Sequence, residues 1–313
     1  MYVDGILPDG LCLISIPFYL LLMVACVKFR HQEPFSSSFF VLTFSQGMAD
    51  LLMIVTLFLL LKPPICYGLF TDVYLSHPLI LGQLQAFFSM GICSLQHISL
   101  LLIALNRFTA VCIPMRHNKI WKRSTITVVI ILQWSIPTLL YAPIFSFDVQ
   151  FVEIANSSKL GLSYGNQQVL SIYYTIGFVT ILTTVIACSV LYALQFLVMW
   201  KQRSRSGVIS SEARIEFRMA IMGAIIFVIS SCYLFFLITS IVAPSILQTA
   251  FDLVWLYFLA TAIMSSVNPF IIIGMSKKVR TACFGLIYTF YASDRDAPLN
   301  SSRIRSSELM NAK

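Results

Sequence analysis

Long apolar stretches separated by short polar segments dominate this chain of 313 residues. Several contain no Asp, Glu, Lys or Arg, including residues 73–106, 124–147 and 160–200. A helix needs about 20 apolar residues to cross a bilayer, because every backbone amide there must be bonded within the chain. The pattern therefore predicts seven membrane-spanning helices, at about 11–28, 38–61, 82–106, 124–144, 168–200, 219–242 and 253–275.

The composition supports the same class of protein. Of all residues, 58% are hydrophobic and 11% are charged, whereas soluble domains average about 45–50% and about 25%. Too few polar residues are present to cover a water-soluble globule, and too many apolar ones for a disordered chain. We therefore expect an all-α integral membrane protein, a seven-transmembrane helix bundle.

The basic residues lie almost entirely on one side of the predicted membrane. The loops after spans one, three and five, together with the segment after span seven, share a face and hold 19 of the 21 lysines and arginines. The other face holds Lys62 and Lys159. Because basic residues are retained in the cytoplasm, we expect the N-terminus outside and the C-terminus inside. The net charge of +8 then favours anionic lipid of the inner leaflet as a partner, not nucleic acid.

An amphipathic helix is predicted after span seven, at about 277–290. Its apolar stripe recurs at helical spacing and consists of Val279, Ala282, Cys283, Leu286, Ile287 and Phe290. We expect this helix in the inner interface, with Cys283 either palmitoylated or a bare thiol facing lipid. One transmembrane domain is thus expected at 1–291, followed by a flexible cytoplasmic tail at 292–313.

Two glycosylation sequons occur, on opposite sides of the predicted membrane. Asn156 begins Asn-Ser-Ser in the outer loop between spans four and five, and Asn300 begins Asn-Ser-Ser in the cytoplasmic tail. Because N-glycans are typical of exported surface loops, we expect a glycan on Asn156 and none on Asn300.

The sequence shows no pattern typical of an enzyme or a metal site. The four histidines are not spaced as metal ligands, and no Gly-rich phosphate loop or Ser–His–acid arrangement stands out. We therefore expect no catalytic activity and no cofactor.

Apart from Lys28 at the inner end of span one, Asp50 is the one charged residue within the predicted spans. An ionisable group at this depth costs a few kcal/mol on insertion scales, so it should face the bundle interior and have partners. We interpret it as a conformational switch and a possible cation site. The alternative is a protonated Asp that is hydrogen-bonded for packing alone.

Asn268-Pro269-Phe270 lies within span seven. Pro269 removes one helix hydrogen bond and so favours a bend about which a helix can pivot. Asn268 is predicted to meet Asp50 if spans two and seven are neighbours.

Asn106-Arg107 lies where span three reaches the predicted cytoplasmic face. We expect the helix to continue inward and to stop before Pro114. Arg107 would then project into a cytoplasmic cavity and pair with Glu212, Glu216 or a partner's carbonyl groups. The alternative is an arginine that only reaches toward lipid headgroups.

In this order on seven spans, these features resemble the G-protein-coupled receptors, and more closely the nematode serpentine chemoreceptors of the Srg superfamily, class V (Srv). The resemblance extends to about Phe290. The stretches that carry it are Ile16–Leu20, Phe35–Phe40, Ser45–Asp50, Leu105–Ala110, Pro114, Ile120–Trp121 and Asn268–Phe270.

The resemblance implies a chemosensory receptor in the plasma membrane of sensory cells, with a small-molecule ligand and a heterotrimeric G protein as partners. It implies that Arg107 contacts the G protein, with Asn106 where rhodopsin-like receptors have an acid. The acid–arginine restraint of those receptors is then missing. Their cysteine tether from the loop after span four is missing too.

The charges also restrict the ligand. Span seven has no lysine for a retinal Schiff base, and span three has no carboxylate to pair with a cation. A pocket in the outer half would therefore suit a neutral or weakly polar molecule. Candidate lining residues are Ser89, Cys93, Gln96, His97, Tyr141, Tyr173, Tyr174, Trp255 and Tyr257.

Two other classes of protein were weighed. A small-molecule transporter or channel subunit should show polar residues along one face of several spans, and flux without a G protein would indicate it. A membrane enzyme should show a clustered nucleophile and base, or metal ligands. Neither class accounts for Asn106-Arg107 together with the basic inner loops.

Overall fold

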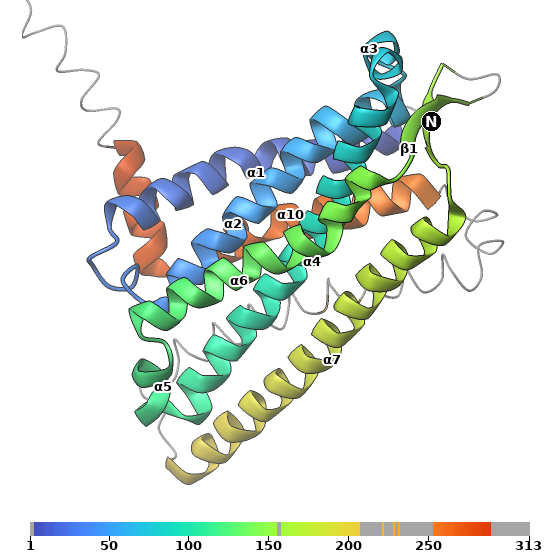
Figure 1. Cartoon of the computed structure of the whole chain (residues 1–313). Helices are drawn as coiled ribbons and strands as arrows, with labels where there is room; N and C mark the ends of the chain where they lie inside the picture. Colours follow the sequence, from blue (N-terminus) through green and yellow to red (C-terminus); the bar gives the residue numbers. More distant parts are fainter. Residues whose placement is uncertain are drawn as a thin grey trace, which may run out of the picture.

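A computed structural model describes residues 3–154, 158–206 and 253–288, with single positions 221, 228 and 231 between. Long helices run alongside one another in an elongated bundle (Figure 1). We call the end that carries the β-strands the outer end and the opposite end the inner end, following the predicted orientation.

Within the described part of the chain, six helices are long and apolar enough to cross a membrane. They are α1 (Val3–Lys28), α2 (Ser38–Thr56), α4 (Pro78–Cys112), α6 (Arg123–Tyr141), α7 (Gln167–Ser206) and α10 (Leu253–Met275). Predicted spans one to five and seven are thereby confirmed as helices. Span six, predicted at 219–242, lies largely outside the described residues.

Three of these helices, α1, α4 and α7, extend several residues beyond their predicted spans, and α7 runs to Ser206 instead of residue 200. α1 begins at Val3 instead of residue 11. Asp9 is paired with Lys62, so its charge is compensated within the helix and does not have to lie in a loop before it. α4 runs to Cys112 and ends before Pro114, as predicted for span three.

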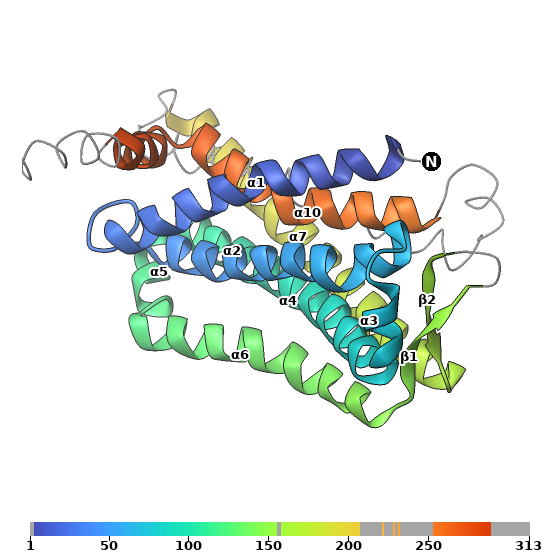
Figure 2. The same ribbon diagram turned by 90° about the horizontal axis from the view of Figure 1, so that it is seen from above.

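α4 lies at the centre of the bundle. It packs against α2, α6 and α7, while α1 packs against α2 and α10. The second view shows the same arrangement from above (Figure 2). Side chains on α4 can therefore reach several neighbouring helices.

The outer end of α2 changes its helical type. Leu57–Leu61 and Pro63–Tyr67 are π-helical, in which hydrogen bonds close one residue later than in an α-helix. Pro63 and Pro64 have no backbone N–H to continue an α-helical ladder. The segment ends at Gly68, whose φ of 62° is left-handed, and the short helix α3 (Thr71–Ser76) follows.

The outer loop after α6 contains a β-hairpin, which the sequence analysis did not predict. A 3-10 turn (Ala142–Ser146) leads into β1 (Val149–Glu153), which pairs antiparallel with β2 (Leu160–Tyr164). Phe151 of β1 packs edge-on against Tyr74 of α3, with ring centroids 5.2 Å apart. The sequon residue Asn156 lies outside the described residues.

Hydrogen bonds and a close backbone approach hold this hairpin to α4. The Gln83 amide donates to the carbonyls of Phe145 and Phe147, at 3.2 and 2.8 Å. A Cβ at Gly82 would lie 2.5 Å from the carbonyl oxygen of Val149. The loop thus stays against span three although it contains no cysteine.

Gly82→Ala is expected to destabilise the protein, because the added methyl group meets backbone that cannot move away. Gly91→Ala is the matched control on the same helix, since its Cβ would meet only the Tyr141 ring, at 3.8 Å. Gly→Ala within a helix is otherwise worth about 1 kcal/mol in stability. The melting temperature of the purified protein should therefore fall for Gly82→Ala and rise for Gly91→Ala. A shift upward for both would contradict the close approach.

The helix after span seven spans 277–288 and packs part of its apolar stripe on the bundle, while Ile287 of that stripe stays exposed. Val279, Cys283 and Leu286 are buried in one cluster with Cys26 and Phe35. The Cys283 side chain has no exposed surface, so neither an acyl chain nor lipid reaches it in this conformation. The predicted tail, 292–313, lies outside the described residues.

Candidate functional site

A carboxylate with four hydrogen-bond donors occupies the middle of the bundle. The Asp50 oxygens accept bonds from the Tyr19 hydroxyl (2.6 Å) and from the amides of Gln46 (2.8 Å), Gln96 (2.7 Å) and Asn268 (2.7 Å). All five side chains are buried. We call these five residues the Asp50 cluster.

The cluster joins four helices. Tyr19 comes from α1, Gln96 from α4 and Asn268 from α10, while Gln46 lies one turn before Asp50 on α2. The predicted meeting of Asn268 with Asp50 is thus present. Pro269 follows within α10, which continues to Met275, and the pivot about Pro269 stays a prediction.

All four donors to Asp50 are neutral groups. Hydrogen bonds to a charged acceptor are stronger than bonds between neutral groups, so the carboxylate is held without a paired cation side chain. Within the described residues, no three His, Cys, Asp or Glu side chains are grouped to hold a metal ion. A cation site would have to use oxygens such as that of the Gln46 amide, which is buried without a hydrogen-bond partner in the described part of the chain. The cation site at Asp50 stays a prediction.

A second polar group extends from the Asp50 cluster toward the inner end. The Gln133 amide of α6 donates to Ser99 of α4 (2.5 Å) and accepts from Ser45 of α2 (3.2 Å). The Trp134 indole also donates to Ser45, at 3.0 Å. Ser45 and Ser99 each lie about one turn inward from a member of the Asp50 cluster.

Arg107 is buried at the inner end of α4, with 6% of its surface exposed. Its guanidinium lies 4.1 Å from the ring centroid of Phe39, and one of its nitrogens donates to the Asn106 side-chain oxygen at 3.1 Å. The Asn106 amide donates in turn to Ser38, at 2.8 Å. The expected projection into a cytoplasmic cavity is therefore wrong for this conformation. A neutral amide takes the acceptor position that an acid would fill, while Glu212 and Glu216 lie outside the described residues.

Thr109, one turn beyond Asn106, anchors the inner loop that follows α4. Its hydroxyl receives a hydrogen bond from the Trp121 indole (2.8 Å) and lies 3.1 Å from Nδ1 of His117. The short helix α5 (Pro114–Ile120) is thereby fixed against the inner end of α4. It presents Met115 with 90% of its surface exposed.

The predicted ligand-pocket residues on α4 do not share one role. Gln96 belongs to the Asp50 cluster and also donates to Ser265, at 3.0 Å. Ser89 donates within its own helix, to Ala86 at 3.4 Å. His97 is bonded to the carbonyl of Cys93 at 2.8 Å.

The predicted aromatic lining falls into two groups. Tyr257 lies with Cys93 in an outer apolar cluster that also holds Phe58 and Phe258. Tyr141 stacks with Tyr173 (5.6 Å between centroids), and its hydroxyl lies 2.9 Å from that of Ser94. The first group includes Tyr257 and Phe258 of α10 itself, and the second packs with Val149 of the hairpin.

Two of the aromatic candidates stand apart from these groups. Tyr174 is half exposed on α7. The side chain of Trp255 lies outside the described residues. All nine pocket residues stay candidates. The structure brings Cys93 together with His97 and Tyr257, and Tyr141 together with Tyr173.

Gln85, a buried residue in the outer half of α4, was not among the predicted site residues. Its side-chain oxygen has no hydrogen-bond partner among the described residues. It lies four residues before Ser89 and eleven before Gln96, so all three share the interior face of α4. Its glutamine type within an apolar span, at this spacing, was the signal that could have identified it.

The architecture and the site together define a class of protein. Apolar helices surround a central carboxylate, and an arginine lies at the inner end of the central helix, as in seven-transmembrane G-protein-coupled receptors. A family model described as the serpentine type 7TM GPCR chemoreceptor Srv matches residues 10–287. The chain therefore belongs to the Srv family of serpentine chemoreceptors.

A curated relative agrees with this assignment. Serpentine receptor class V-1 of Caenorhabditis elegans is 27% identical over 152 residues, which is 48% of this chain and 48% of the relative. The chain thus aligns with about half the length of that relative. The multi-pass membrane class and the receptor family predicted from the sequence are confirmed.

Proposed function

We propose that the chain binds a small, uncharged molecule in the outer half of its bundle and signals through a heterotrimeric G protein at the plasma membrane of sensory cells. The observation that supports this most is the row of buried polar residues along α4. From Gln85 through Gln96 and Ser99 to Arg107, it links the outer half to the inner end.

The Asp50 cluster couples this row of residues on α4 to the neighbouring helices. Because Asp50 is bonded to α1, α4 and α10 at once, α10 cannot shift against α4 without exchanging those bonds. A ligand that binds one packing more tightly shifts the population toward it. Arg107 then leaves the Phe39 ring and becomes available to the carbonyl groups of a G-protein helix.

The charges of the outer half support an uncharged ligand. Lys62 and Asp9 are deeply placed there but neutralise each other as an ion pair. Gln85 instead offers a side-chain oxygen that has no hydrogen-bond partner among the described residues. A molecule with one hydroxyl or amide donor on an apolar body fits these groups.

The experiment is expression in reporter cells with a co-expressed G protein, followed by a screen of volatile and small excreted metabolites. A neutral hit should evoke signalling that vector-transfected cells lack. Gln85→Leu should reduce its potency by about twofold to tenfold, since one lost hydrogen bond is worth about 0.5–1.5 kcal/mol. Substrate flux or ionic current in liposomes without a G protein would instead support a transporter or channel.

A further inference from the structure

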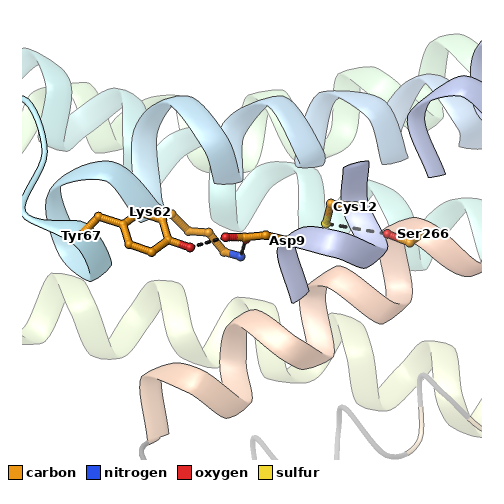
Figure 3. Close-up of polar contacts among 5 residues, drawn as sticks. All are labelled: Asp9, Cys12, Lys62, Tyr67 and Ser266. Carbon is orange, nitrogen blue, oxygen red and sulfur yellow. Dashed lines mark hydrogen bonds and ion pairs between the residues drawn. The ribbon is translucent and has the colours of Figure 1, made fainter. Parts of the chain in front are cut away.

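Lys62 is a buried cation at the outer end of the bundle. Only 2% of its side chain is exposed, and its ammonium forms an ion pair with Asp9 of α1 (Figure 3). Removing one partner of a buried pair leaves an uncompensated charge, which is strongly destabilising. The pair therefore favours strongly the helix arrangement that brings α1 and α2 together here.

Tyr67 is the second partner of Asp9. Its hydroxyl donates to the other carboxylate oxygen of Asp9, so the acid is held from both sides (Figure 3). Burial and the neighbouring carboxylate raise the pKa of Tyr67 well above its usual value. The hydroxyl thus keeps its proton and remains a donor.

The Lys62 ammonium lies beside two aromatic rings, one from the end of its own helix α2 and one from α10. It lies 5.6 Å from the ring centroid of Phe58 and 5.4 Å from that of Phe258, which is buried on α10. Both distances are within the range of cation–π attraction. One turn inward from Asp9, Cys12 accepts a hydrogen bond from Ser266 of α10, at 3.7 Å.

The same helix is thus held at two levels. Phe258 and Asn268 are ten residues apart on α10, or about 15 Å at 1.5 Å per residue. The upper contact depends on Lys62 and the lower one on Asp50. A movement of the outer part of α10 separates Phe258 from the ammonium before it disturbs Asp50.

We propose that Asp9, Lys62, Tyr67 and Phe258 form an outer latch that holds α1, α2 and α10 in the inactive arrangement and opens on activation. The inference rests on the proposed receptor function. The latch is closed by groups of the chain itself, so a ligand opens it by displacing α10 and need not carry a charge.

The test measures ligand-free signalling in reporter cells at matched surface expression. Asp9→Asn and Lys62→Met should each raise basal signalling about fivefold or more, the lower range of allosteric coupling. The exchanged pair Asp9→Lys with Lys62→Asp should return it toward the wild-type level. Asp72→Asn, the same change at an exposed acid of α3, is the control and should have no effect.

Thermal melting of the four latch proteins (wild type, both single variants and the exchanged pair) separates the latch from the receptor function. A coupling between Asp9 and Lys62 in melting should appear whether or not the protein signals. If that coupling is present while basal signalling falls or stays constant in the single variants, the pair only stabilises the fold and the proposal is overturned. If neither the wild type nor any variant signals with any G protein, the proposed receptor function fails instead. If the melting temperatures show no coupling between Asp9 and Lys62, the latch itself is overturned.

Discussion

Replacing Asp50 with leucine is expected to remove most of the folded receptor from the cell surface. Four buried donors would lose their shared acceptor. Three of these bonds join α2 to other helices. Hydrogen bonds between membrane helices average about 0.6 kcal/mol and reach about 1.7 kcal/mol, so the three amount to about 2–5 kcal/mol. That loss is a large fraction of a typical unfolding free energy of about 5–15 kcal/mol.

Asp50→Asn should lower stability by an intermediate amount. The asparagine keeps one acceptor oxygen, but its NH₂ group replaces the other and lies opposite hydrogen-bond donors. Thr43→Val is the matched control on α2, because the Thr43 hydroxyl is buried without a hydrogen-bond partner among the described residues. Melting in detergent and antibody staining of intact cells measure the series. Equal melting temperatures of Asp50→Leu and Thr43→Val would show that the Asp50 cluster does not stabilise the bundle.

Replacing Arg107 with alanine is expected to lower ligand-evoked signalling by about tenfold or more at equal surface expression. A charge-assisted hydrogen bond to a G-protein carbonyl is worth about 1.5–3 kcal/mol, and 1.4 kcal/mol is tenfold in an equilibrium constant. Arg107→Lys should recover part of the response, because it keeps the charge but loses the planar guanidinium.

Phe39→Leu should change signalling in the opposite direction. The Phe39 ring covers the guanidinium at 4.1 Å, so its removal weakens the buried position of Arg107 and should raise basal signalling. Opposite signs for these two adjacent residues distinguish a released arginine from one that only supports the fold. An unchanged response of Arg107→Ala would contradict its role in G-protein coupling.

Much of the bundle was predictable, because a bilayer leaves few choices. Apolar runs must be helical where water is absent, and α2 and α10 begin where spans two and seven were predicted. The pairing of Asp50 with Asn268 was also predictable, since a polar group at this depth must find a partner. Tyr19, Gln46 and Gln96 were not, because their roles depend on which helices become neighbours.

Other features depend on tertiary contacts that no local pattern encodes. The apolar stripe that contains Cys283 fits either lipid or protein, and packing against Cys26 and Phe35 decides between them. The strands of the outer hairpin are five residues each, and their position depends on Gly82 of another helix. Arg107 at a helix end is equally suited to lipid headgroups and to a buried site over Phe39.

The π-helical end of α2 affects how residues can be compared between relatives. Each wide turn takes up one extra residue, which rotates the following side chains by roughly 100° relative to a continuous α-helix. Lys62 follows the π-helical segment Leu57–Leu61 and faces Phe258. In a continuous α-helix from Asp50, its side chain would point in a different direction. In a relative with a regular helix here, the residue aligned twelve positions after the aspartate would point elsewhere. An equivalent of Lys62 should therefore be sought by its place in space and not by its column in an alignment.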